Sequence, residues 1–167
     1  MNCFPDTSFL CSLYRRQVNS TLAISWMKQR TGPLPVSSFL LLEFRQSTRL
    51  QVKLRSSDKN KGFDLLEASQ MLRDLDLDLR NGVLKPEPVD WAVVHHLAED
   101  LSARYTASVG HRLADILHVA TALHLGKTEF LTFDANQRSL AEAVGLTKPT
   151  IERRASNIDT AVPNPTL

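Results

Sequence analysis

Four short apolar segments alternate with longer amphipathic ones along this chain, and the alternation predicts an α/β fold. The apolar segments cover residues 2–6, 34–38, 83–85 and 130–133. Apolar residues at helical spacing lie between them, so helices are expected to join successive strands. Strands that alternate with helices form a parallel sheet covered on both faces. We therefore expect three layers, with the carboxyl ends of the strands along one edge, where α/β proteins bind ligands.

Caps and breakers set approximate bounds for the helices. Thr7 or Ser8 is expected to cap the first helix, and Ser37 or Ser38 the third. Apolar and acidic residues alternate over 75–79, which fits either a strand or a helix end, and we favour the helix end. The expected helices cover residues 9–16, 22–28, 38–54, 63–75, 90–107, 111–126 and 136–146.

Length and composition indicate one soluble domain. A chain of 167 residues is long enough for a single core. No apolar run approaches the ~20 residues that span a bilayer, and no leader pattern precedes the first strand. We therefore expect a cytoplasmic protein without a membrane partner. The two cysteines, Cys3 and Cys11, are too few for a disulfide framework or a zinc site.

Positive charge is concentrated in the first third of the chain. Residues 1–62 contain ten Lys and Arg and three acids, whereas residues 63–167 contain ten and fifteen. This asymmetry permits a basic face for nucleic acid, although solvated helix faces are the simpler explanation. Four arginines are candidates for phosphate contact, with surface solvation as the alternative: Arg15, Arg16, Arg45 and Arg49.

Four acids stand in apolar surroundings. Asp6 and Asp134 each follow an apolar strand, and Glu43 and Asp115 lie among apolar residues of helices. Taken singly, each acid could cap a helix or pair with a nearby arginine. Gathered at one edge, they would repel one another unless a divalent cation neutralised them. Carboxylate oxygens suit Mg²⁺ or Mn²⁺, which activate water for phosphodiester hydrolysis.

Histidines offer a competing metal site. His111, Asp115 and His118 share one helical face at i, i+4 and i+7, a pattern that a transition metal could use. We favour the alternative that His118 packs or hydrogen-bonds beside the acids, because the carboxylates already suit a hard cation. No glycine-rich phosphate loop occurs, which argues against nucleotide binding of that kind.

Four motifs together resemble the PIN domain family and, within it, the VapC-like toxin ribonucleases of bacterial toxin-antitoxin systems. They are "DTS" after the first strand, "FLLLEFR" in the third helix, "DILHVATALHLG" and "FLTFDANQRSLAEAVGL". The resemblance covers residues 1–148, the expected nuclease domain, and leaves residues 149–167 as a poorly ordered tail. It implies a three-layer α/β/α fold with a central parallel sheet of about four to five strands.

The same resemblance implies a ribonuclease that uses Mg²⁺ or Mn²⁺. Carried over position by position, the catalytic and metal-binding acids are Asp6, Glu43, Asp115 and Asp134. Thr7 and Ser8 match the family's Ser or Thr after the first acid and are expected to orient Asp6 by hydrogen bonding. Thr132 is a further supporting candidate. The resemblance also implies an RNA substrate, a product with a 5′-phosphate, a small antitoxin that blocks the site, and a homodimer.

Two departures from the family pattern bear on this hypothesis. Pro5 stands where the family usually has an apolar residue in a central strand, and proline cannot donate a ladder hydrogen bond there. Residues 53–90 form a longer stretch than in compact members, which suggests an added helix or a partner surface. The alternative function is a non-catalytic PIN-like module that binds RNA or protein. A phospho-acceptor domain is disfavoured because no lysine lies between Lys127 and Lys148.

Overall fold

The computed structural model describes residues 2–149, in which short strands and helices alternate as the sequence predicts. The strands are β1 (Cys3–Pro5), β2 (Leu34–Val36), β3 (Leu84–Pro86) and β4 (Glu129–Leu131). The helices are α1 (Thr7–Tyr14), α2 (Ser20–Gln29), α3 (Ser38–Ser57), α4 (Leu65–Arg80), α5 (Trp91–Val109), α6 (Leu113–His124) and α7 (Ala135–Ala143). Of the predicted tail, all but Pro149 lies outside the described residues.

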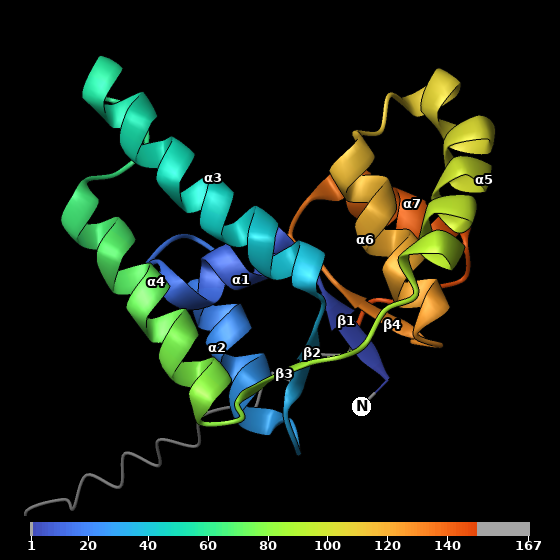
Figure 1. Cartoon of the computed structure of the whole chain (residues 1–167), viewed down its shortest axis with the longest axis horizontal. Coiled ribbons are helices and arrows are strands. Elements are labelled where there is room, and N and C mark those ends of the chain that lie inside the picture. The colour runs from blue at the N-terminus through green and yellow to red at the C-terminus, as the bar shows by residue number, and fades with distance from the viewer. Residues whose placement is uncertain (1, 150–167) are drawn as a thin grey trace, which may run out of the picture.

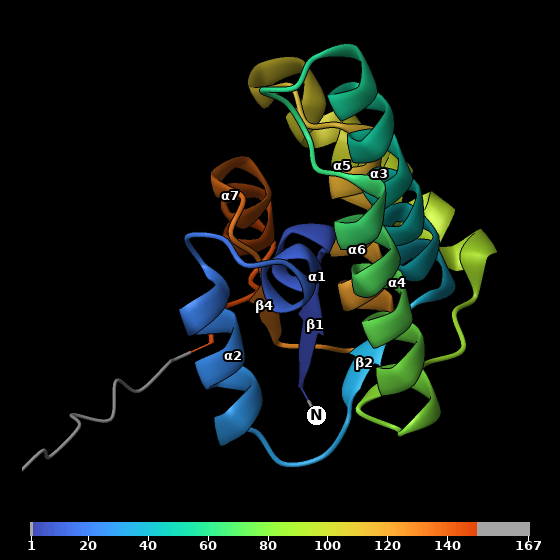
Figure 2. The same cartoon turned by 90° about the vertical axis from the view of Figure 1, so that its left-hand side faces the viewer.

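The four strands are parallel and lie in the order β4, β1, β2, β3. They hydrogen-bond as two pairs, β1 with β4 and β2 with β3, where the sequence predicts one continuous sheet. β1 and β2 nevertheless lie side by side, so the two pairs adjoin each other at these strands. Figure 2 shows the strands between α2 and α7 on one side and α3 to α6 on the other, the layered arrangement expected of an α/β fold.

Two prolines explain why β1 and β2 do not form a ladder. Main-chain groups of alternate residues in a strand point to the same neighbour. The Asp6 amide donates to the Leu131 carbonyl of the β4 side (3.0 Å), so the preceding Pro5 faces β2. The Leu34 amide donates to the carbonyl of Val83, the residue just before β3 (2.8 Å), so the next residue, Pro35, faces β1. Because proline has no N–H, each strand lacks a donor at the shared edge.

The helices form two groups beside the strands. α3 and α4 pack against each other at one end of the molecule, and α5 packs on α6 at the other (Figure 1). The longer stretch over 53–90 supplies α4, which also contacts α1. None of the helices in the described part of the chain is long and apolar enough to cross a membrane.

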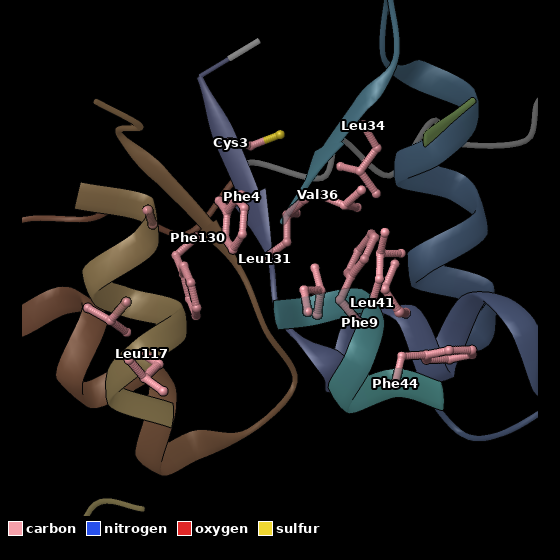
Figure 3. Packing of buried hydrophobic residues seen from close by; sticks show 14 of the residues in the cluster. Cys3, Phe4, Phe9, Leu34, Val36, Leu41, Phe44, Leu117, Phe130 and Leu131 are labelled. Carbon is pink, nitrogen blue, oxygen red and sulfur yellow. The ribbon is translucent and has the colours of Figure 1, made fainter. Parts of the chain in front are cut away.

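The core fills the space between the strands and these helices. Figure 3 shows Phe4, Phe130 and Leu131 of the strands among buried side chains from α1, α3 and α6. Phe4 is fully buried, and Phe9 of α1 packs edge-on against Trp26 of α2 with ring centroids 5.6 Å apart. Burial of these rings fixes the first helix against the carboxyl end of β1.

Some helix bounds differ from those predicted. α1 begins at Thr7 and is capped by Asp6, so the predicted caps Thr7 and Ser8 are wrong. Because the strand ends at Pro5, the carboxylate of the following residue, Asp6, can accept a hydrogen bond from the Phe9 amide. Ser37 caps α3 as predicted, and residues 75–79 belong to α4, which confirms a helical end there.

A close backbone contact fixes the connection from α3 to α4. Gly62 has a left-handed φ of +62°, and a Cβ built on it would lie 2.0 Å from the Gln51 carbonyl oxygen of α3. Gly82 has a similar φ of +70° but open space around it. The two glycines thus share a backbone conformation and differ in their surroundings.

We expect Gly62→Ala to lower the free energy of unfolding by about 3 kcal/mol, through both backbone strain and a forced shift of the loop. Gly82→Ala, the matched control, should cost only about 1 kcal/mol because it introduces backbone strain alone. Urea denaturation of the two variants measures the difference. Equal losses would show that the loop moves away from α3 without cost.

Candidate active site

Asp6 is buried at the junction of β1 and α1. Its side chain accepts hydrogen bonds from the Phe9 amide (2.8 Å), the Ser8 hydroxyl (2.7 Å) and the Thr132 hydroxyl (2.5 Å). Burial raises the pKa of the Asp6 carboxyl, although the hydrogen bonds from Thr132, Phe9 and Ser8 partly oppose the rise. The predicted ligand is therefore also the cap of the first helix.

Ser8 and Thr132 tie the end of β4 to the start of α1. The Phe133 amide donates to the Ser8 hydroxyl (2.9 Å), and the Asp134 amide donates to the Thr132 hydroxyl (3.0 Å). Each hydroxyl thus donates to Asp6 and accepts from the loop after β4. The contact of Ser8 with Asp6 is the one that the resemblance implies, and Thr132 contacts Asp6 as well.

Glu43 lies in the second turn of α3 and reaches two neighbouring elements. Its carboxylate accepts from the Thr7 hydroxyl of α1 and pairs with His118 Nε2 of α6 (2.5 Å). Burial acts to raise the pKa of Glu43, but the hydrogen bonds and the charge of His118 outweigh it, and the pKa is lowered. The expectation that Thr7 orients Asp6 is therefore wrong: its hydroxyl points away from its sequence neighbour and donates to Glu43 of α3.

Asp115 and Asp134 form the second pair of acids. Asp115 is half-buried in the first turn of α6, and its pKa is raised by burial and by the nearby charge of Asp134. Asp134 is exposed and caps α7, accepting from the Gln137 amide at 2.9 Å. The fold thus brings these two acids within electrostatic reach of each other.

Three of the acids share one neighbour, His118, but the four acids do not form one ligand cluster. The charge of His118 acts to lower the pKa of Asp6, Glu43 and Asp115. Burial, and after it the charges of Asp6 and Glu43, raises the pKa of the Cys11 thiol to about 12. Within residues 2–149, no three Asp, Glu, His or Cys side chains are arranged as a metal site. Hydroxyl and ring groups occupy the oxygens of Asp6 and Glu43 instead.

The donor chemistry nevertheless suits a hard divalent cation. All four predicted ligands are carboxylates, which Mg²⁺ and Mn²⁺ prefer. The pKa values of Asp6 and Asp115 are raised mainly because burial takes their carboxylates out of water, and nearby groups do not fully offset the loss of solvation. A cation would supply that compensation and favour the ionised form of both groups.

The transition-metal alternative has no support from the geometry. His111 precedes α6, which begins at Leu113, and is buried with its Nδ1 lacking a partner among the described residues. His118 is buried and bonded to Glu43, as the favoured alternative predicts. The sequence spacing therefore does not produce a ligand pair.

A surface hollow of about 410 Å³ adjoins Asp134. Ser8 and Phe133, whose main chain or side chain belongs to the contacts around Asp6, also line it, together with Gln17 and Asn19. A hollow of this size has room for part of an extended polymer beside Asp134.

Of the four candidate arginines, two already have acidic partners. Arg15 pairs with Glu67 (2.9 Å) and Arg45 with Asp76 (2.8 Å), while Arg16 and Arg49 are exposed. The structure thus distinguishes arginines that brace helices from arginines that face solvent.

Gln137 is a site residue that sequence reasoning missed. Gln137 is buried. Its main-chain N–H donates to the Asp134 side chain, and its side-chain nitrogen donates to the main-chain carbonyl of Asp115 at 3.3 Å. Gln137 thus joins the turns that carry both acids. The available signal was the Asp-x-x-Gln spacing, which resembles a helix capping box.

Comparisons with known proteins agree with this architecture. The PIN domain family model matches residues 3–143. Among solved structures, the VapC20 toxin of Mycobacterium tuberculosis, described as a Sarcin-Ricin loop cleaving toxin, matches with a TM-score of 0.61 and 18% identity. The match covers 88% of this chain and 98% of that one. No curated protein matches the sequence. Since the family model spans most of the chain, the protein belongs to the PIN domain family.

Proposed function

We propose that this protein is a ribonuclease that hydrolyses phosphodiester bonds with Mg²⁺ or Mn²⁺. The observation that carries the proposal is that the PIN family match over residues 3–143 includes all four predicted ligands. Asp6, Glu43, Asp115 and Asp134 would hold the cation. When bound, the cation supplies an activated water and stabilises charge on the leaving oxygen.

The chain's own residues would prepare these acids in distinct ways. Thr132 and Ser8 hold the Asp6 carboxylate, while Thr7 and His118 hold Glu43. The Asp115 carboxyl, whose pKa is raised by burial and by the charge of Asp134, would also gain from a nearby positive charge. Burial of Asp6 keeps water away from its oxygens, which strengthens any electrostatic interaction made there.

We extend the proposal to the biological setting of a VapC-like toxin. Residues 1–148 would form the nuclease domain, and a small antitoxin would block the site. The VapC20 match supports this at the level of fold. Exposed leucines on α3, such as Leu42 and Leu50, offer apolar surface for a homodimer or the antitoxin.

The direct test is RNA cleavage by the purified protein. We expect cleavage of a mixed RNA substrate in the presence of Mn²⁺ or Mg²⁺, 5′-phosphate ends on the products, and loss of cleavage on adding EDTA. Cleavage that persists in EDTA would contradict the metal-dependent mechanism.

The alternative is a PIN-like module that binds RNA or protein without cleaving. It is favoured by the absence of a ready three-ligand arrangement within residues 2–149. If the protein binds RNA but does not cleave it with either metal, this alternative is the correct one.

The exposed arginines give a separate prediction about RNA binding. We expect the Arg16→Gln, Arg49→Gln double variant to weaken RNA binding and to reduce the slope of log affinity against log salt by about one to two, since each lost phosphate contact removes about 0.7 to 0.9 from it. The matched control is Arg45→Gln, whose guanidinium already pairs with Asp76. Fluorescence anisotropy over a range of salt concentrations measures both slopes. Identical slopes for the double variant and the wild type would show that Arg16 and Arg49 do not contact the RNA phosphates.

A further inference from the structure

His118 is a buried histidine whose polar contacts go to a single carboxylate and its hydroxyl partner. The ring lies in the middle of α6, and its side chain is 2% exposed. Its Nε2 lies 2.5 Å from Glu43 Oε2 and 3.4 Å from the Thr7 hydroxyl. Its Nδ1 is buried and has no partner among the described residues. The ring therefore makes its hydrogen bonds on one side only, towards Glu43.

Packing holds the ring in that orientation. The Phe39 ring lies against His118 with centroids 5.1 Å apart, and Phe39 also contacts Trp91 of α5. Phe39 and Glu43 lie one turn apart on α3, so the same helix supplies the carboxylate and the ring that packs against the imidazole. A rotation of His118 away from Glu43 would break the hydrogen bond of a buried ring nitrogen, which carries a cost in stability.

Glu43 needs such a partner because its partly exposed side chain is not held in one rotamer by packing alone. Its side chain is 26% exposed, and a glutamate side chain that is partly in water has several accessible rotamers. Thr7 and His118 approach it from two different helices and fix both its direction and its reach.

We propose that His118 is a positioning residue that aims the Glu43 carboxylate at the bound divalent cation. This inference rests on the proposed metal-dependent function and goes beyond it, since His118 is neither a ligand nor a catalytic residue in it. Groups that hydrogen-bond to metal ligands fix their orientation, and their loss typically weakens metal binding 10-fold to 100-fold.

The test is Mn²⁺ binding measured by calorimetry on the full chain, with Mn²⁺ alone as the probe. We expect His118→Leu to raise the Kd for Mn²⁺ by about 10-fold to 100-fold. His118→Gln, whose amide nitrogen reaches the position of Nε2, should stay close to the wild-type Kd. His118→Asn has the same amide on a shorter chain, so it should resemble His118→Leu. The exposed His96→Gln serves as the control on α5.

A merely structural role would give a different pattern. In that case the Gln and Asn variants would lose Mn²⁺ affinity equally, in step with their loss of thermal stability. A second measurement uses the Glu43→Gln background, in which adding His118→Leu should cause no further loss of affinity. If His118→Leu does not fold, the comparison of Gln with Asn decides.

The outcomes separate the inference from the proposed function. Wild-type binding of Mn²⁺ together with an unchanged Kd in the folded His118→Leu or His118→Asn variant would overturn the role of His118 alone. No binding of Mn²⁺ by the wild type would overturn the proposed metal dependence, and the positioning role with it.

Discussion

Asp6→Asn is expected to abolish RNA cleavage while the protein still folds. Asn caps helices about as well as Asp, so its side-chain oxygen can still accept from the Phe9 amide. The raised pKa of Asp6 means that its ionised form is less favourable in the folded protein than in the unfolded chain. Replacing that buried charge by a neutral amide removes this cost, which offsets the hydrogen bond from Thr132 that the amide nitrogen cannot accept.

The catalytic loss should be large because the substitution removes a proposed metal ligand. A cation contributes several kcal/mol to the stabilisation of the transition state, and 4 kcal/mol corresponds to roughly a 10³-fold change in rate. Initial rates of cleavage with Mn²⁺ and thermal melting of the same preparations measure both effects. Asp115→Asn should lose activity similarly, whereas the exposed Asp100→Asn should keep it.

An Asp6→Asn variant that still cleaves RNA at near the wild-type rate would contradict its role as a ligand. A variant that loses both activity and fold would instead indicate that the hydrogen bonds of Ser8 and Thr132 to the carboxylate hold this junction together. Asp6→Ala is the reference for the capping role, since loss of a cap costs about 1 kcal/mol.

Phe44→Ala is expected to lower the free energy of unfolding by about 4 kcal/mol, a large part of the 5–15 kcal/mol typical of a domain. The Phe44 ring is fully buried and packs edge-on against Tyr14 with centroids 5.6 Å apart. Truncation removes apolar contacts and leaves a cavity between α3 and α1. Chemical denaturation measures the loss.

Leu42→Ala is the matched control because it removes an aliphatic side chain from the same helix. Leu42 is 63% exposed, so its truncation should change stability by less than about 0.5 kcal/mol. Comparable losses from the two substitutions would mean that this face of α3 is covered in solution, which would in turn support the proposed dimer.

The periodicity of apolar residues predicted the strands and helices of this protein but not which strands pair. Alternating apolar strands and amphipathic helices predicted the four strands and the seven helices of residues 2–149 in order. The split of the strands into two pairs followed from the directions in which Pro5 and Pro35 face. Those directions depend on which neighbour each strand bonds, which a single sequence does not specify.

The acids show the same division. Their positions at strand ends and helix starts were readable from the sequence, because parallel strands bring their carboxyl ends to one edge. The hydrogen-bond partners were harder to predict. Glu43 bonds to Thr7 and His118, which lie 36 and 75 residues away in the chain. Only packing of α1, α3 and α6 brings these three side chains together.

The sequence by itself determined the α/β class and the order of the elements, and it singled out the four acids as candidate ligands, because each of these depends on local spacing or on a motif. The tertiary structure decided that Asp6 caps α1 and how each acid is held. It also decided that Arg15 and Arg45 are paired while Arg16 and Arg49 are exposed. The physical reason is that burial and hydrogen bonding depend on contacts between segments far apart in the chain, whereas helix and strand periodicity depends on neighbours.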